Sequence, residues 1–293
     1  MRPIAGVGTD AATPGFDFTN ETQGSPGEVN IDGNHSFTAV SNTVGKMIGD
    51  QLVANGKSWK SYQENLPLSG ADGINYSDGF FTNQTDFTQI MPQLTPPLTQ
   101  ADVVQLYAAK HNPFVYFKSV QEGRRRDNSL KNVVGFDGPA GLYADLASGN
   151  LPNFLFIVPN QCNDQHGRAN AGKVCNFDPL VDGSQSGLNP ALIYRGDVTV
   201  QRLVNAIHAS PTWRENRSAI IVMWDENDYS LSPNVNQVMV IVDTNYGEEG
   251  RVQSSHFYTH FSLLKSLEAA FQLPCLNHAC DNTTDVMSDL FAP

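Results

Sequence analysis

Two clusters of polar side chains, each directly after an apolar run, combine residue types that bind divalent metal ions and transfer protons. The clusters are Asn160, Asp164 and His166 after residues 154–158, and Asp225 and Glu226 after residues 219–224. Carboxylates that lie close together need a compensating positive charge, which a divalent metal ion supplies. Oxygen ligands suit Ca²⁺, Mg²⁺ or Mn²⁺, and added histidine also suits Zn²⁺ or iron. Such an ion can polarise a phosphoryl oxygen and stabilise an attacking or leaving oxygen, so the clusters favour a functional metal site.

The pattern of apolar residues predicts the elements that hold these clusters. Apolar strands without alternation, separated by helices, indicate an α/β protein with a mostly parallel sheet covered on both faces, a three-layer α/β/α sandwich. The predicted strands are 58–64, 114–119, 153–158, 219–224 and 237–242, and the predicted helices are 44–55, 99–110, 138–148, 198–209 and 261–271. Asp197 is a candidate N-cap for the helix at 198–209. Residues 1–43 are expected to be irregular, and residues 44–293 to form one domain.

Ligands of open α/β sheets bind beyond the carboxyl ends of the strands. Adjacent parallel strands at 153–158 and 219–224 would therefore bring the two clusters together. Taken singly, Asp164 or Asp225 is more often a helix cap or a turn residue, and His260 at a helix start is more often structural. The functional interpretation is favoured because both clusters end core strands.

Charge and hydropathy exclude several classes of protein. The chain of 293 residues has a net charge of −12, which disfavours general binding of nucleic acid. Its longest apolar runs are too short for a transmembrane segment, and no basic-then-apolar leader follows Met1. The basic run Arg124–Arg126 is interpreted as a solvated loop, with a phosphate or headgroup contact as the alternative.

The four cysteines form two pairs that are close in sequence. Metal-ligand spacing of the C-x-x-C type is absent. We therefore expect two local disulfides, Cys162–Cys175 and Cys275–Cys280, and an oxidising location, either secreted or periplasmic.

Several segments together resemble the bacterial phosphoesterase family that contains acid phosphatases and phospholipases C. The matching segments are residues 152–166 (PNFLFIVPNQCNDQH), the pair Gly196-Asp197, the triplet Trp224-Asp225-Glu226, residues 259–264 (THFSLL) and residues 273–276. The acid phosphatase branch is closer, because of the NDQH and WDEND sequences. The resemblance implies an alkaline-phosphatase-like fold.

The resemblance also implies roles for individual residues. Asp225 and Glu226 match the acidic pair that holds the metal ion. Asp164, His166 and His260 match polar residues that line the phosphate site and are the catalytic candidates. Asn160 is a further candidate for contact with the substrate.

One part of the family pattern has no match. Family members begin with a core strand that ends in a metal-binding Glu-Asn pair, and a Ser or Thr nucleophile follows it. The segment Gly33–Ser36 (GNHS) is similar but lacks the Glu and the preceding apolar strand. We expect the first core strand, two metal ligands and the nucleophile to be missing, either by truncation or in a degenerate relative. If the chain is active as it stands, its nucleophile is expected among the Ser and Thr residues of 36–43.

The leading hypothesis is a metal-dependent phosphomonoesterase, or a phosphodiesterase of the phospholipase C type, acting on a small-molecule or lipid phosphate ester. An alternative is a non-catalytic secreted protein that keeps the fold. A sulfatase-like hydrolase is a third hypothesis, which would need a modified Cys or Ser nucleophile. Neither the metal, the substrate headgroup nor the oligomeric state is predicted.

Overall fold

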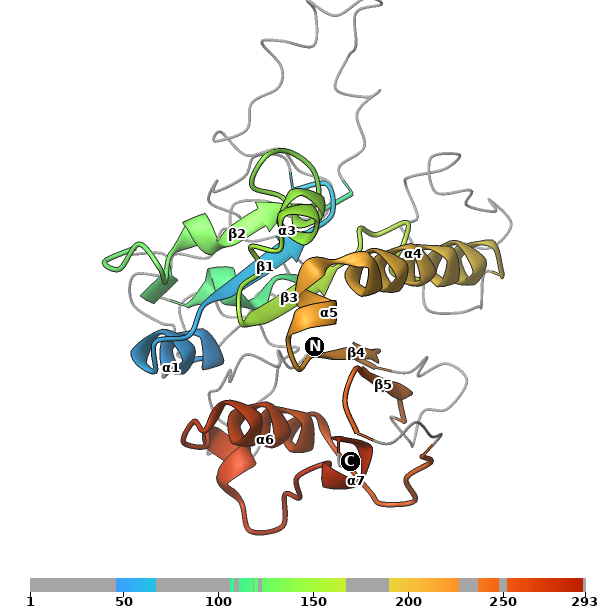
Figure 1. The fold of residues 1–293 in the computed structure, drawn as a ribbon. Coiled ribbons are helices and arrows are strands. Elements are labelled where there is room, and N and C mark those ends of the chain that lie inside the picture. Colours follow the sequence, from blue (N-terminus) through green and yellow to red (C-terminus); the bar gives the residue numbers. More distant parts are fainter. Residues whose placement is uncertain are drawn as a thin grey trace, which may run out of the picture.

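The computed structural model describes residues 46–66, 106–107, 111–117, 119–120, 123–166, 190–226, 237–247 and 252–291. Its elements in these ranges are α1 (Ile48–Ala54), β1 (Trp59–Gln63), η7 (Pro113–Tyr116), η8 (Leu130–Asn132), β2 (Val133–Gly135), α3 (Leu142–Ser148), β3 (Phe154–Val158), α4 (Pro190–Ala209), α5 (Pro211–Glu215), β4 (Ala219–Met223), β5 (Val240–Thr244), α6 (His260–Phe271), η10 (Asn277–Cys280) and α7 (Ser288–Phe291) (Figure 1). The predicted irregular segment 1–43 lies outside the described residues. So does the predicted helix at 99–110, apart from residues 106–107.

Strand β1 is the centre of a parallel sheet with the strand order β2-β1-β3. Its register aligns Trp59 with Phe154 and Gln63 with Val158 on one side, and Ser61 with Val133 on the other. The strands predicted at 58–64 and 153–158 are confirmed to within one residue at each end. Strand β2 was not predicted, because three residues give too short a pattern.

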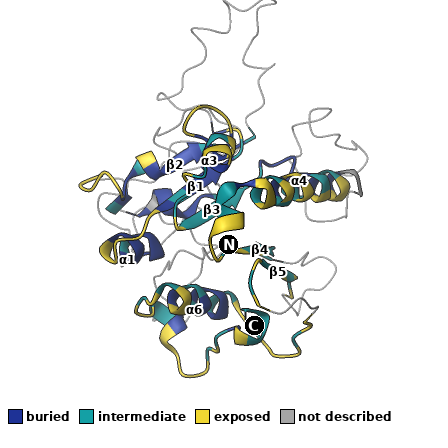
Figure 2. Cartoon of the chain, in the orientation of Figure 1, coloured by how far each residue is buried: buried dark blue, intermediate teal, exposed yellow. Residues whose placement is uncertain are grey.

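Alternate side chains of the sheet face two different helical layers. Phe154 and Phe156 pack with residues of α1 and α6. Leu155 and Ile157 pack with residues of α3 and α4. The central strand between these layers is buried along most of its length (Figure 2). Helices therefore cover both faces of the sheet, which confirms the predicted three-layer α/β/α arrangement.

Strands β4 and β5 form a separate antiparallel pair, with Ala219 opposite Thr244 and Met223 opposite Val240. The prediction that the strand at 219–224 pairs in parallel beside the strand at 153–158 was wrong for the described residues, where β4 and β3 belong to different sheets. A parallel connection needs a crossover, usually a helix, whereas antiparallel strands do not. The sequence between β4 and β5 gave no helical pattern, which is consistent with the antiparallel arrangement. The strand predicted at 237–242 begins and ends two or three residues later.

The strand predicted at 114–119 was also wrong, since residues 113–116 form the 3₁₀-helix η7. Pro113 occupies the first turn, where its fixed φ favours a helical start. Phe114 is buried and stacks on Trp59 of β1 with ring centroids 4.7 Å apart. The apolar run therefore fills the core as a turn of helix and does not extend the sheet.

The disulfide Cys275–Cys280 is confirmed, and it closes the turn after α6 that contains η10. Cys162 is also disulfide-bonded. Its predicted partner Cys175 lies outside the described residues, so that pairing stays a prediction. None of the helices in the described part of the chain has the length and apolar character needed to span a membrane.

Candidate active site at the carboxyl ends of the strands

The carboxylate of Glu64, directly after β1, holds the loop that follows β3. It accepts a hydrogen bond from the amide of Asn160 at 2.9 Å. Its two oxygens also accept from Nδ2 of Asn163 at 2.9 and 2.8 Å. Charge-assisted bonds of this kind are roughly twice as strong as neutral ones. The loop with the first predicted cluster is therefore fixed to the central strand.

Asn160 shapes this loop from inside. Its side chain is 5% exposed. Its Oδ1 accepts from the amides of Cys162 and Asn163 at 2.8 and 3.1 Å, and its Nδ2 donates to Oδ1 of Asn65 at 2.5 Å. Such bonding of an Asn side chain to amides further along the chain is the usual device that closes a turn. The structure gives Asn160 this role in the loop, and its contact with a substrate stays a prediction.

Asp164 and His166 lie next to each other at the end of the loop. The amide of His166 donates to Oδ1 of Asp164 at 3.0 Å. The other carboxylate oxygen, Oδ2, is 3.8 Å from Nδ1 of His111, a residue that precedes η7. The Asp164 carboxylate thus lies beside a second imidazole that would form an ion pair with it when protonated. His166 is exposed.

A side-chain bridge joins this loop to the end of β4. The indole Nε1 of Trp224 donates to Oε1 of Gln165 at 2.7 Å, and Nε2 of Gln165 donates to the carbonyl of Ile193 in α4 at 3.1 Å. Although β3 and β4 belong to separate sheets, their carboxyl ends are therefore held together. This contact places the segment that contains Asp225 beside the segment that contains Asp164.

His260 joins the start of α6 to the end of β4. Its Nε2 lies 2.7 Å from the carbonyl oxygen of Asp225. A carbonyl oxygen only accepts, so Nε2 carries the hydrogen, and in the neutral ring Nδ1 carries the lone pair. The hydroxyl of Thr259 caps the helix by accepting from the amide of Ser262, which fixes the helix start. We call Glu64–Asn65, Asn160–His166, Arg195, Trp224–Glu226 and His260 together the carboxyl-edge site.

Helix α4 packs closely on the loop at Gly196. A Cβ atom at this position would lie 2.2 Å from Cγ of Gln165 and 3.1 Å from the carbonyl oxygen of Asn163. The prediction that Gly196-Asp197 precedes a helix starting at Val198 was wrong, because α4 begins at Pro190 and includes both residues. Glycine costs about 1 kcal/mol relative to alanine inside a helix, and here it allows the close approach of the loop.

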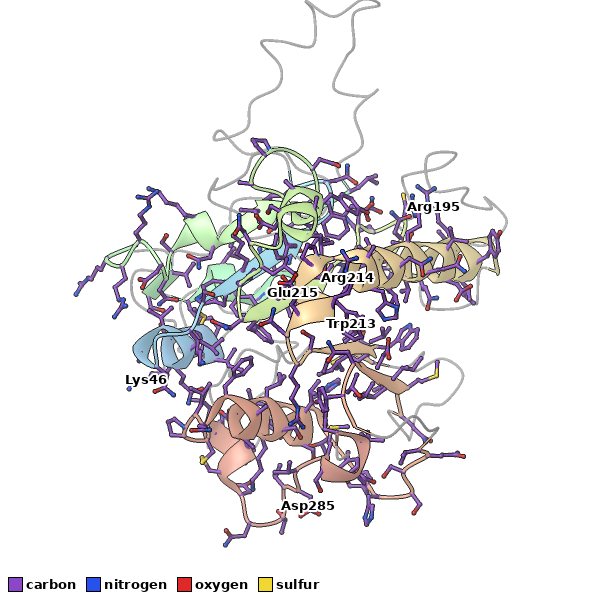
Figure 3. The ribbon with its side chains drawn as sticks, in the orientation of Figure 1. Lys46, Arg195, Trp213, Arg214, Glu215 and Asp285 are labelled. Carbon is purple, nitrogen blue, oxygen red and sulfur yellow. A yellow bond between two sulfur atoms is a disulfide. The ribbon has the colours of Figure 1, made fainter. Side chains whose placement is uncertain are left out.

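The same helix brings a cation to the site. Nε of Arg195 donates to Oδ1 of Asn163 at 2.7 Å. Figure 3 shows Arg195 on α4 (Pro190–Ala209), the helix that lies beside the end of β3. A guanidinium presents several donors in a planar fork that matches a phosphate group.

The predicted metal site depends on side-chain donors from both of these segments. The described residues contain no group of three or more His, Cys, Asp or Glu side chains placed to hold one metal ion. Asp225 and Glu226 adjoin His260 through the Asp225 carbonyl, and Asp164 and His166 form a second pair. The described donors do not amount to a complete metal site.

Sequence reasoning missed several residues of this site, notably Glu64, Asn163 and Arg195. Glu64 carried a usable signal, because it lies at the carboxyl end of the strand predicted at 58–64, as Asp225 does at that of the strand predicted at 219–224. Asn163 belongs to the matching segment 152–166, but only Asn160, Asp164 and His166 of that segment were predicted as site residues. Nothing in the sequence distinguishes Arg195 from other helical arginines.

Replacing Gly196 by Ala is expected to lower the free energy of unfolding by about 1–3 kcal/mol, because the added methyl group displaces Gln165. Loss of the Gln165 bridge should also loosen the end of β4. Urea unfolding measures the first effect. The matched control is Asn205→Ala at an exposed position of the same helix, which should change stability by no more than about 0.5 kcal/mol. Equal stability of the two variants would contradict the steric argument.

The fold and the site define the chain as an α/β sandwich with carboxylates, imidazoles and a guanidinium at the carboxyl ends of its strands. The chain belongs to the Phosphoesterase family, whose sequence profile matches residues 13–176 and 182–274. The resemblance to this family is thereby confirmed, and the acid phosphatases to which the chain is similar confirm the acid phosphatase branch.

Several fungal proteins are similar to this chain. The acid phosphatase of Aspergillus fumigatus is 28% identical over 233 residues, which are 78% of this chain and 40% of that protein. The phosphate-repressible acid phosphatase of Penicillium chrysogenum is 27% identical over 244 residues, 83% of this chain and 46% of that protein. The probable acid phosphatase of Kluyveromyces lactis is 26% identical, covering 82% of this chain and 45% of that protein. The chain spans less than half the length of these relatives. A bacterial source stays a prediction.

Proposed function

We propose that this chain hydrolyses phosphate esters at the carboxyl-edge site, as an acid-phosphatase-like phosphomonoesterase. The observation that carries the proposal is the meeting of three segments at one edge. The Gln165–Trp224 bond joins the loop after β3 to the end of β4, and the His260–Asp225 bond joins the end of β4 to the start of α6. Family membership and the names of the similar proteins support the same reaction.

The side chains of this edge suit phosphoryl transfer. The reaction needs positive charge against the phosphoryl oxygens, which the guanidinium of Arg195 supplies. The leaving oxygen needs a proton, which an imidazole such as His166 or His260 would deliver. We assign no nucleophile, since the residues 36–43 named from the sequence lie outside the described part of the chain.

A divalent metal ion, with Asp225 and Glu226 as carboxylate ligands, remains part of the proposal as a prediction. So do the wider activity on lipid phosphate diesters and the export of the chain. Carboxylate ligands suit Ca²⁺, Mg²⁺ or Mn²⁺, and histidine suits Zn²⁺ or iron.

The test is hydrolysis of p-nitrophenyl phosphate by the purified chain, before and after treatment with a chelator. We expect turnover that chelation abolishes and that one divalent metal ion restores. A chain that hydrolyses no phosphate ester under any metal would support the alternative, a non-catalytic protein that keeps the fold. Activity that chelation leaves unchanged would contradict the metal prediction and leave the hydrolase proposal standing.

A further inference from the structure

Glu64 directly follows the central strand, and the hydrogen bonds that its carboxylate makes with described residues lead to the loop of the carboxyl-edge site. Its carboxylate accepts from the Asn160 amide and from the Asn163 side chain, both in the loop after β3. Asn163 is 5% exposed, so its amide is shielded from water. A carboxylate beside an anion-binding site would repel the anion, unless hydrogen-bond donors stabilise the negative charge of the carboxylate. Here the donors belong to the loop itself.

The side chain of Asn163 connects the carboxylate of Glu64 to the guanidinium of Arg195. An amide side chain donates only from Nδ2 and accepts only at Oδ1. Because Glu64 binds Nδ2, the oxygen must point the other way, toward Nε of Arg195 at 2.7 Å. The Asn163 amide therefore lies between the carboxylate and the guanidinium and bonds to both. Arg195 donates from its Nε to the amide oxygen of Asn163, and this contact fixes the orientation of its planar guanidinium.

We propose that Glu64 is a positioning residue of the carboxyl-edge site, which fixes Asn163 so that the guanidinium of Arg195 faces the phosphoryl group of a phosphate monoester. The inference rests on the proposed function. The β1 backbone gives Glu64 a rigid base, since β1 is paired on both sides. The close contact of Gly196 with Gln165 holds α4 against the same loop, which limits the freedom of Arg195.

Two substitutions probe the two ends of this chain of bonds. Glu64→Gln keeps the size of the side chain but turns one acceptor into a donor that faces other donors. Arg195→Lys keeps the charge but removes the planar fork. The control is Asp50→Asn, because Asp50 is also a half-buried carboxylate that joins two segments, through the Met47 amide at 2.9 Å and Asn128 at 2.7 Å, away from the site.

The measurements are kcat and KM for p-nitrophenyl phosphate, binding of inorganic phosphate by calorimetry, and the melting temperature. We expect Glu64→Gln and Arg195→Lys each to weaken phosphate binding and lower kcat/KM by about 10- to 100-fold. The double variant should be little worse than either single one, because both act on one unit. Asp50→Asn should lower the melting temperature and leave phosphate affinity and kcat/KM within about twofold.

Three outcomes would overturn the inference, and two of them concern the variants. Glu64→Gln could bind phosphate as tightly as the unmodified chain, or the effects of Glu64→Gln and Arg195→Lys could simply add. If the unmodified chain hydrolyses no ester, the proposed function fails, and calorimetry still decides about Glu64. Phosphate binding that Glu64→Gln weakens would support the positioning role at an anion site. The absence of any phosphate binding would overturn it together with the proposed function.

Discussion

Replacing His260 by Ala is expected to lower kcat/KM for a phosphate ester by about 100- to 10,000-fold, the range typical of a positioned proton donor or acceptor. The imidazole is held at the carbonyl of Asp225, 2.7 Å from its Nε2. Because Nε2 carries the hydrogen, Nδ1 of the neutral ring is the atom that would take up a proton and return it in the proposed reaction. Steady-state kinetics with p-nitrophenyl phosphate over a range of pH measures the effect.

The matched control is His208→Ala. His208 also places its Nε2 2.7 Å from an Asp oxygen, Oδ2 of Asp243, and its ring lies against Trp213. It belongs to the last turn of α4, at the opposite end of that helix from Arg195. The control should change kcat/KM by no more than about twofold, since it lies outside the site. Equal losses of kcat/KM in the two variants would show that His260 affects activity through stability alone. A His260→Ala variant with unchanged kcat/KM would show that His260 takes no part in the reaction.

The sequence predicted the strands of the site better than their partners. The runs at 153–158 and 219–224 are apolar throughout, which marks buried strands whatever they pair with. Which strands pair depends on the segments that connect them, and β4 pairs with β5 and not with β3. The segments that contain the two clusters are nevertheless joined, because Trp224 donates a side-chain hydrogen bond to Gln165, a contact that the periodicity of the sequence does not predict.

The residues missed at the site depend on contacts between distant parts of the chain. Glu64 and Asn163 are 99 positions apart, and Arg195 is a further 32. Their roles depend on which loop lies against which strand end, so residue type alone is not enough. Gly196 shows the same limit. From the sequence alone a glycine inside α4 is expected only to destabilise the helix, and its reason is the loop that packs against it.

Glu268 of α6 should make the stability of the fold depend on pH. Glu268 is 2% exposed, and both of its carboxyl oxygens are buried. Burial raises the pKa of Glu268 from 4.5 to about 8, and the Leu276 amide and the Lys265 ammonium oppose this only in part. At neutral pH the folded chain therefore keeps a proton that the unfolded chain releases.

The direction of the effect follows from proton uptake. Below pH 4.5 both states hold the proton, and the contribution of the neutral carboxyl to stability is fully present. As pH rises from 4.5 to about 8, the folded state alone retains the proton, so stability falls by about 1.4 kcal/mol for each pH unit. At higher pH the buried group is charged in the folded state, and this contribution falls no further.

Glu268→Gln has nearly the same shape and cannot ionise, so it should remove this dependence. The variant is expected to match the unmodified chain near pH 4.5 and to exceed it by roughly 4 kcal/mol at pH 8. Urea unfolding at several pH values measures the difference between the two proteins, in which the other titrating groups cancel. Glu215→Gln, at an exposed position in α5, is the control and should shift stability by no more than about 0.5 kcal/mol at any pH. Parallel stability curves for Glu268→Gln and the unmodified chain would show that the Glu268 carboxyl ionises in the folded state as it does in water.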